Sequence, residues 1–362
     1  MTDHVAKVGV VVPVWNVAPY IERCAESLMA QTLDDMQFVF VDDASPDNSI
    51  EILNAVLERH PERAAQVSVV HHEVNKGLPT ARKTGLAHIN AEYVAHCDSD
   101  DWCDPTMYEK MYLSAKSNGA DMVLCDYYRT DGKKTSTSHI KKPGNDNMAL
   151  AFVHQKLPPY VWCRLTRTEI YRCIDFPVEN YLEDWVQNIQ LHYYCKEADF
   201  IAVPLYYHFC NPTSIVHTNT YESCEEKTRQ CMENMRLFSS FALMNHICTE
   251  KDLILRKSLV RGILKPKLLR FRCRKQYLNM FPEINHSVLF CKNISGFQKL
   301  YFLAVYLNIF LFVYFAYALS CRLVRGIQSL KNKVASRKTA GYLPFRPVAM
   351  LKSAASPAGP VR

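Results

Sequence analysis

The chain is organised around one stretch, Tyr93-Val94-Ala95-His96-Cys97-Asp98-Ser99-Asp100-Asp101-Trp102. A short apolar run, typical of a buried strand, ends here in three carboxylates within four residues. Carboxylates this close raise one another's pKa unless a cation lies among them. Their oxygens suit Mg²⁺ or Mn²⁺, which proteins commonly hold with one or two carboxylates and substrate phosphates. The alternative is an acidic turn in which Ser99 and Asp101 cap a helix that Pro105 helps to begin.

The sequence on both sides of this stretch predicts a doubly wound α/β fold. Strand-like apolar runs lie at 8–14, 38–41, 67–70, 93–96 and 121–125. Helical patterns lie between them, at 21–28, 50–57, 80–90 and 105–118. This alternation indicates a mostly parallel, Rossmann-like sheet with helices on both faces.

Polar side chains follow three of these strands, at Asn16, at Asp42-Asp43 and at Asp98-Ser99-Asp100. Ligands of such sheets bind outside the carboxyl ends of the strands, so we expect these side chains to converge on one site. No GxGxxG or GxxxxGK[ST] motif is present, so phosphate is expected to be held by a metal ion and cationic side chains.

The chain downstream adds further candidate segments. Residues 130–147 are predicted to form a polar loop, and the aromatic segment 158–165 either lines a pocket or forms a packed edge strand. Glu183-Asp184 begins an amphipathic helix, where acids either stabilise the helix dipole or provide a general base.

Composition separates two differently charged regions. The chain has 362 residues with a net charge of +7, but residues 251–362 hold 21 basic and two acidic residues, a net +19. Such a segment favours a polyanionic partner. Residues 251–277 are predicted to form a basic amphipathic helix kinked at Pro266, lying either on an anionic membrane surface or against the protein.

Residues 300–320 carry no charge and as a helix are long enough to enter a bilayer, although a buried helix or an oligomer contact is the alternative. The Pro/Ala/Ser-rich tail is expected to be disordered. Fourteen cysteines without a CxxC pair, and a start without a signal peptide, favour free thiols in a reducing compartment.

From about Val8 to Ile215 the order of motifs resembles family 2 glycosyltransferases, which have the GT-A fold. The motifs are Val12-Pro13-Val14-Trp15-Asn16, the segment 41–47, the segment 75–85, Asp98-Ser99-Asp100 as a DxD motif, and Glu183-Asp184. Two positions depart from the family pattern, since Ala44 stands where Gly is more usual and Lys83 where Asn is frequent.

The resemblance implies a role for each matching residue. Nucleotide-sugar binding would fall to Pro13, Asn16, Asp42, Asp43, Arg82, Asp98 and Ser99. Asp98 and Asp100 would hold the divalent metal, and Asp184, with Glu183 beside it, would act as the base. His208 would either contact the phosphates or the metal, or be a stacked structural residue, and His217 is considered in the same way.

One base and no enzyme nucleophile imply single displacement with inversion at the anomeric carbon. The prediction is a hexosyltransferase-type enzyme that moves one sugar from a UDP-linked donor to a lipid-linked or cell-surface polysaccharide precursor. It is expected to be associated with the cytoplasmic side of a membrane and to need no nucleic acid. A QxxRW-like segment after Asp184 is absent, which argues against a processive synthase.

The predicted organisation is a catalytic GT-A domain at 1–220, a basic helical extension at 221–298, an apolar membrane-associating helix at 299–335 and a disordered basic tail at 336–362. Two other functions are considered. A sugar-phosphate nucleotidyltransferase would need a glycine-rich loop after the first strand. A non-catalytic membrane- or nucleic-acid-binding protein would leave the acidic strand ends unexplained.

Overall fold

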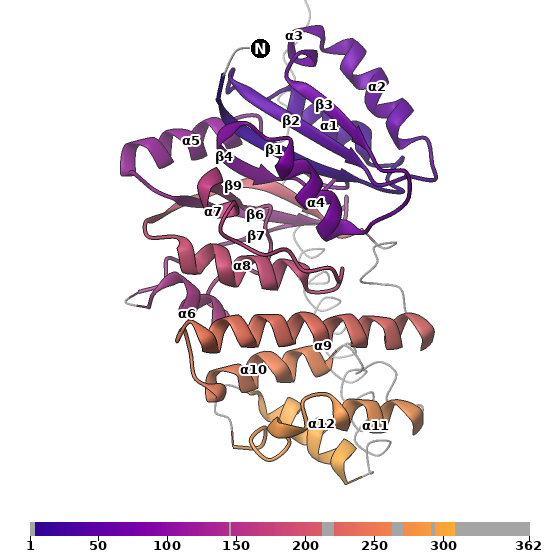
Figure 1. Ribbon diagram of the computed structural model, residues 1–362, viewed down its shortest axis with the longest axis vertical. Coiled ribbons are helices and arrows are strands. Elements are labelled where there is room, and N and C mark those ends of the chain that lie inside the picture. The colour runs from indigo at the N-terminus through magenta and orange to yellow at the C-terminus, as the bar shows by residue number, and fades with distance from the viewer. Residues whose placement is uncertain (1–3, 145, 212–220, 263–270, 291–293, 308–362) are drawn as a thin grey trace, which may run out of the picture. The chain divides into compact units, whose positions relative to one another are not determined.

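A nine-stranded sheet forms the centre of the computed structural model (Figure 1), which describes residues 4–144, 146–211, 221–262, 271–290 and 294–307. Its strands run in the order β3-β2-β1-β4-β8-β6-β9-β5, and β7 pairs with β6. The strands are β1 (Ala6–Val14), β2 (Met36–Asp42), β3 (Val67–His71), β4 (Ala91–His96), β5 (Trp102–Cys103), β6 (Met122–Thr130), β7 (Thr135–Ser138), β8 (Arg164–Arg167) and β9 (Ala198–Phe209).

The α/β fold class is confirmed, and the two halves of the sheet differ in direction. The half β3-β2-β1-β4 is parallel throughout. In the other half β8 runs antiparallel to both β4 and β6, while β6 and β9 are parallel. A regular alternation of strand and helix predicts parallel strands, and it is found only in the first half of the sheet.

The helices of the sheet domain lie on both sides of the sheet and at its lower edge in Figure 1. They are α1 (Ile21–Met29), α2 (Ser49–Arg59), α3 (Pro61–Ala64), α4 (Leu78–Ala87), α5 (Met107–Asn118), α6 (Met148–Val153), α7 (Thr168–Tyr171) and α8 (Glu183–Tyr194). They are followed by α9 (Tyr221–Met244), α10 (Glu250–Arg261), α11 (Phe271–Asn279), the 3₁₀ turn η3 (Pro282–Ile284) and α12 (Gly296–Tyr306).

Strand β1 explains why its run of β-branched residues is continuous. Val8, Val10 and Val12 belong to the main core, together with buried residues of α1 and α5. Val11 faces the opposite side, where α4 lies so close that a Cβ on Gly85 would come within 2.4 Å of the Val11 side chain. A strand covered on both faces buries every side chain, so polar alternation disappears.

Two segments differ from their predicted structure. The predicted strand at 121–125 continues to Thr130, and the polar region after it returns as β7 rather than remaining a loop. The aromatic segment 158–165 enters β8, which lies between β4 and β6 and is therefore an interior strand, not an edge strand.

Buried arginines hold α10 against the sheet domain and against the segment after α11. Arg256 of α10 is 2% exposed and donates Nε to the carbonyl of Val153, 3.0 Å away, at the end of α6. Arg261 is buried and donates to the carbonyls of Met280 and Phe281, each at 2.6 Å. The predicted basic face is therefore wrong for these two residues. A buried guanidinium satisfies main-chain carbonyls at helix and turn ends that would otherwise lack donors.

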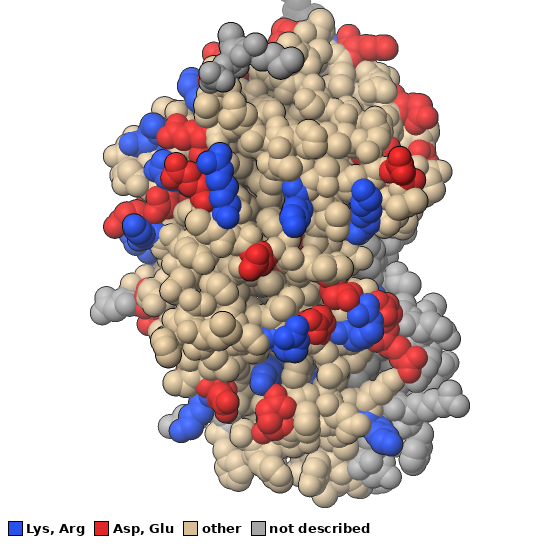
Figure 2. Space-filling model, in the orientation of Figure 1, with Lys and Arg blue, Asp and Glu red and all other residues tan. Residues whose placement is uncertain are grey.

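The chain divides into two units, residues 1–295 and 296–362. No helix within the described ranges is both long and apolar enough to cross a bilayer. Pro266, most of the apolar segment 299–335 and all of the tail 336–362 lie outside the described residues. The face of the molecule in Figure 2 carries acidic and basic side chains interspersed with one another. Nine cysteines with described side chains, at positions 24, 97, 103, 125, 163, 173, 195, 210 and 248, form no disulfide.

Candidate active site

Asp101 holds strand β9 against the acidic stretch. It is 1% exposed, and its carboxylate accepts hydrogen bonds from the Tyr206 hydroxyl at 2.8 Å and from the Phe209 N–H at 2.6 Å. Burial raises its pKa well above the usual range, and the charges of Asp100 and Asp98 raise it further. Asp101 therefore has a structural role. It binds β9, whereas the sequence suggested that it caps a helix.

Asp98 and Asp100 are the carboxylates left available at this strand end. Asp98 Oδ1 accepts from Arg82 Nη2 at 2.7 Å, and Asp100 Oδ2 accepts from Asn211 Nδ2 at 3.1 Å. Burial, followed by the charge of Asp98, raises the pKa of Asp100 to about 6. Among the described residues no group of three potential ligands gathers around one point. This donor set suits a hard cation held by two carboxylates and completed by substrate phosphates.

Arg82 of α4 connects the strand end with the start of α8. Its side chain is buried, and its two terminal nitrogens contact Asp98 and Glu183. Glu183 is also buried and accepts a second hydrogen bond, from Gln187 one turn along the helix. The ion pairs bring the two acidic motifs together, with Glu183 as the counter-charge of Arg82.

Asp184, the next residue of α8, is only partly buried. Burial raises its pKa to about 6; the charge of Arg82 opposes this shift and that of Asp98 adds to it. A carboxylate with a pKa slightly below neutrality is largely ionised at pH 7 and still a useful proton acceptor.

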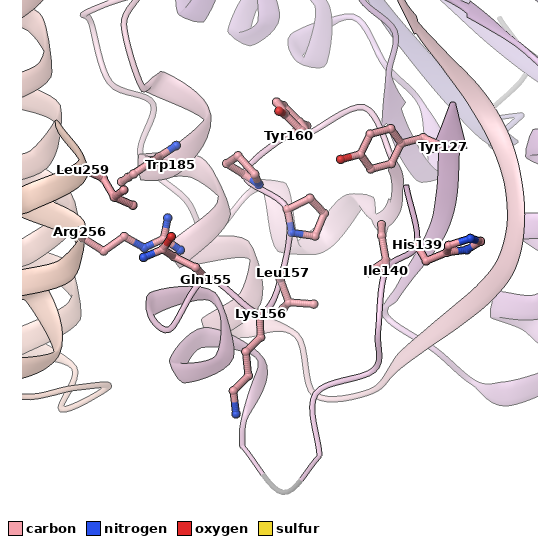
Figure 3. Close-up of a pocket in the computed structure, with 12 residues that line it drawn as sticks. Tyr127, His139, Ile140, Gln155, Lys156, Leu157, Tyr160, Trp185, Arg256 and Leu259 are labelled. Atoms are coloured by element: carbon pink, nitrogen blue, oxygen red, sulfur yellow. The ribbon is translucent and has the colours of Figure 1, made fainter. Parts of the chain in front are cut away.

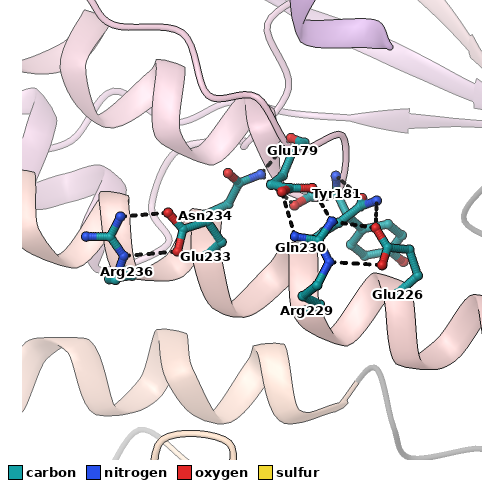
Figure 4. Close-up of polar contacts among 8 residues, drawn as sticks. All are labelled: Glu179, Tyr181, Glu226, Arg229, Gln230, Glu233, Asn234 and Arg236. Atoms are coloured by element: carbon teal, nitrogen blue, oxygen red, sulfur yellow. Dashed lines mark hydrogen bonds and ion pairs between the residues drawn. The ribbon is translucent and has the colours of Figure 1, made fainter. Parts of the chain in front are cut away.

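The loop at 175–182, which delivers Glu183 and Asp184, is clamped by α9 (Figure 4). Arg229 binds the Glu179 carboxylate at 2.7 and 2.8 Å. Asn234, which is 1% exposed, donates Nδ2 to the carbonyls of Glu179 at 2.8 Å and Tyr181 at 2.9 Å. Sequence reasoning did not identify this clamp, because its partners come from a helix 50 or more residues later.

The residues expected to bind the nucleotide at the first two strand ends differ in their exposure. Asn16 is exposed, and its N–H donates to Ser45 Oγ at 2.8 Å. Asp42 is partly exposed and accepts from the Ser45 N–H at 2.8 Å. Pro13 is buried within β1.

Asp43 is buried and orders the turn that leads into α4. Its carboxylate accepts from the N–H groups of Lys76 and Gly77, both at 2.8 Å, and contacts His72 Nδ1 at 2.7 Å. Its oxygens are thus engaged by the protein itself. Ser99 is also buried, within the acidic stretch.

His208 lies in an aromatic stack. Its ring packs against Trp162 at 5.4 Å and Tyr160 at 5.8 Å between centroids, and Trp162 stacks in turn on Tyr206 at 4.3 Å. Burial lowers its pKa, while the nearby charge of Asp98 opposes that shift. The stack runs from the neighbourhood of the acidic stretch to Tyr160. His217 lies outside the described residues.

A cavity of about 340 Å³ is lined by residues of β6, α8, α10 and the segment before β8 (Figure 3). Its wall includes Tyr160, Trp185 and Arg256, and the charge of Asp184 acts on the pKa of both Tyr160 and Arg256. Of these three, only Tyr160 lies in a segment that the sequence suggested for a pocket. Arg256 left one usable signal, because it stands three residues after Leu253 and four before Val260, on the apolar side of its helix.

Comparison with known proteins gives a consistent result. Residues 9–175 match the model of the family described as glycosyl transferase family 2. The glycosyltransferase EpsH of Bacillus subtilis is 30% identical over 220 residues, which are 58% of this chain and 62% of EpsH. The chain therefore spans less than two thirds of that relative. The poly(ribitol-phosphate) beta-glucosyltransferase of Bacillus spizizenii is 31% identical over 143 residues, 39% of this chain and 22% of that protein.

The solved structures extend the likeness of fold beyond the matched region. The structure of S. aureus TarS 1–349 in complex with UDP-GlcNAc superposes with a TM-score of 0.54 at 16% identity. The match covers 87% of this chain and 92% of that one.

Proposed function

Because this chain carries a glycosyltransferase family 2 domain with the GT-A fold at residues 9–175, we propose that it transfers a single sugar, with inversion, from a UDP-linked donor to an acceptor hydroxyl. One observation supports this most directly. Arg82 pairs with both Asp98 and Glu183, which supports a single site that includes the acidic strand end and Asp184, the residue after Glu183.

Each group has a distinct task in this proposal. Asp98 and Asp100 would hold Mn²⁺ or Mg²⁺, which when bound supplies positive charge for the diphosphate leaving group. Asn16 and Asp42 stand at the exposed ends of β1 and β2, where the nucleoside would bind. Arg82, which contacts the Asp98 carboxylate, would approach the nucleotide or its phosphates, and His208 would support the site through its aromatic stack.

Asp184 is assigned as the general base. An acceptor hydroxyl is a weak nucleophile at pH 7, so its proton must leave as the new bond forms at the anomeric carbon. The proton passes to the Asp184 carboxylate, and the C–O bond to the diphosphate breaks with its electron pair remaining on the leaving oxygen. Since the enzyme contributes no nucleophile, the configuration inverts.

The acceptor is proposed to be a lipid-linked or cell-surface polysaccharide precursor, met at the cytoplasmic side of a membrane. Two facts support this: residues 251–362 carry a net charge of +19, and one relative is named for glucosylating poly(ribitol phosphate). A sugar-phosphate nucleotidyltransferase is not favoured, because the comparisons find glycosyltransferases.

Nucleotide binding tests the metal and donor site. We expect UDP to bind in the presence of Mn²⁺ and this affinity to fall about tenfold or more in Asp100→Asn, because one charged ligand is lost. Asp199→Asn serves as the control, since Asp199 bonds Ser114 and Asn118 away from the site. UDP affinity that is the same with and without Mn²⁺, and unchanged in Asp100→Asn, would contradict the assignment.

A further inference from the structure

Five separate parts of the chain line the cavity, one of which is the segment His139-Ile140. Tyr127 comes from β6, Tyr160 from the segment before β8, Trp185 from α8 and Arg256 from α10 (Figure 3). Trp185 directly follows the proposed base. Asp184 itself does not line the cavity, but its charge acts on two residues that do, Tyr160 and Arg256, so the carboxylate lies near the cavity.

The aromatic residues of the wall suit a sugar ring. Tyr160 stacks on Trp162 at 4.7 Å between centroids, and Tyr127 meets Tyr160 edge-on at 6.0 Å. Rigid aromatic faces like these pack well against the apolar C–H face of a pyranose. Burial raises the pKa of Tyr160 to about 12, so its hydroxyl keeps its proton and can donate a hydrogen bond.

Arg256 brings a buried positive charge to the same cavity. Its guanidinium lies 4.5 Å from the Trp185 ring centroid and 4.7 Å from that of Phe152. Its hydrogen bonds go to the carbonyls of Phe152 and Val153 through Nη2 and Nε. Burial lowers its pKa to about 9, so it remains charged at neutral pH.

Arg256 makes no ion pair among the described residues, in contrast to two other residues that line the cavity. Lys156 pairs with Asp146 at 2.7 Å, and His139 pairs with Asp126 at the same distance. The charge of Asp184 acts on Arg256 from beyond ion-pair distance, and the hydrogen bonds of the guanidinium to Val153 and Phe152 use Nε and Nη2. A buried cation with no carboxylate in direct contact is costly, and an anionic ligand would reduce that cost.

We propose that this cavity binds the acceptor's sugar ring and that Arg256 selects acceptors carrying an anionic group, a phosphate or a carboxylate, on or next to that ring. The inference rests on the proposed function and adds the substrate class of its acceptor side. The hydroxyl to be glycosylated would face Asp184, while the anionic group would lie toward α10.

Three probes with the same ring test the preference in the full-length protein. Methyl glucoside, glucose 6-phosphate and glucuronic acid are titrated by ligand-observed NMR, with and without saturating UDP and Mn²⁺. We expect at least one anionic sugar to bind about tenfold more tightly than the neutral one, the gain of one charge-assisted hydrogen bond. The two anionic probes tell phosphate from carboxylate. Inorganic phosphate alone should bind weakly, because it lacks the ring.

Substitutions test whether Arg256 is the residue responsible for the preference for anionic sugars. Arg256→Gln should abolish it without changing UDP affinity, Arg256→Lys should retain part of it, and Arg261→Lys, a change of the other buried arginine of α10, should leave it intact. Survival of the preference in Arg256→Gln would overturn the proposal, as would equal binding of neutral and anionic sugars to the wild type. The wild-type comparison decides the matter even if Arg256→Gln does not fold. Sugar binding is also measured without nucleotide. The preference for anionic sugars can therefore be absent while UDP binding is present, and UDP binding can be absent while the preference is present.

Discussion

The carboxylates of Asp98, Asp100 and Asp101 are neighbours in sequence but meet three different environments. Asp98 faces the guanidinium of Arg82, Asp100 faces an amide, and Asp101 is buried against Tyr206 and β9. Only the first two keep the exposure that a cation site needs. Function at this strand end is therefore decided by each side chain's partner rather than by the acidic character that all three share.

The backbone conformation of Ala44, which stands where Gly is more usual in the family, explains that preference for Gly. Ala44 adopts a φ of 53°, in the left-handed region, where an L-residue with a Cβ is strained and Gly is not. The turn after β2 thus has the conformation that accounts for Gly being more usual in the family that the sequence resembles.

Asp184 is predicted to reduce stability at neutral pH. Its folded-state pKa, about 6, lies above the ordinary aspartate value of 3.8, so the ionised form is disfavoured in the folded protein. The stabilisation of the protonated form is complete below about pH 4 and is lost as pH rises through 6. We expect Asp184→Asn to raise the free energy of unfolding by about 1–3 kcal/mol at pH 8, with little change at pH 4.

Thermal unfolding of the wild type and Asp184→Asn across this pH range measures the change in stability. Transferase assays measure the loss of activity in the variant. Transfer should be nearly abolished in Asp184→Asn while UDP affinity is kept, and the wild-type rate should fall as pH drops below about 6. Substantial residual transfer would remove Asp184 from the role of base.

At the scale of elements, α9 determines where α8 begins. The loop at 175–182 carries no regular structure of its own, and Arg229 and Asn234 hold it from one side. Asn180 holds it from the other, since its Oδ1 accepts from the Leu78 N–H at 2.9 Å at the start of α4. Helix α4 carries Arg82, and α8 begins with its ion-pair partner Glu183. The loop therefore contacts both helices that provide the ion pair.

Asn234→Ala tests this coupling. Losing two hydrogen bonds to the loop should cost about 1–3 kcal/mol of stability and lower kcat about tenfold, with UDP affinity unchanged. Glu233→Gln is the matched control, because Glu233 pairs only with the exposed Arg236 on the same helix in Figure 4. Equal kcat values for Asn234→Ala and the wild type would show that the clamp has no role in placing Asp184.

At the scale of the whole molecule, residues 1–295 form a unit that contains the sheet, the acidic stretch and the cavity. The remaining residues, from 296 onward, form the second unit. The +19 charge spreads over both, and its buried members Arg256 and Arg261 serve the first.

Removing residues 296–362 should therefore leave a folded protein that binds UDP with wild-type affinity. On the proposed membrane role, it should also move from the membrane fraction to the supernatant on sedimentation. A truncated chain that still sediments with membranes would assign membrane contact to the first unit. Loss of UDP binding would contradict the division into units.

Much of the first half could be predicted because its signals are local. A run such as Val8 to Val14 is buried on both faces in any parallel sheet, and the placement of Asn16, Asp42 and Asp98 at strand ends follows from where each run stops. The mixed half could not be predicted in this way. β8 pairs with β4 and β6 through contacts that no periodicity encodes.

The sequence by itself determined the parallel half of the sheet, the acidic strand end and the position of Glu183-Asp184 at a helix start. The tertiary structure alone decided the surroundings of each charge. It pairs Arg82 with Asp98 and Glu183, Asp43 with the turn before α4, and it places Arg256 at a cavity without a direct ion pair. The physical reason is range. Apolar periodicity acts between residues a few positions apart, whereas the pKa and availability of a charged group depend on whatever the fold places within a few ångströms of it.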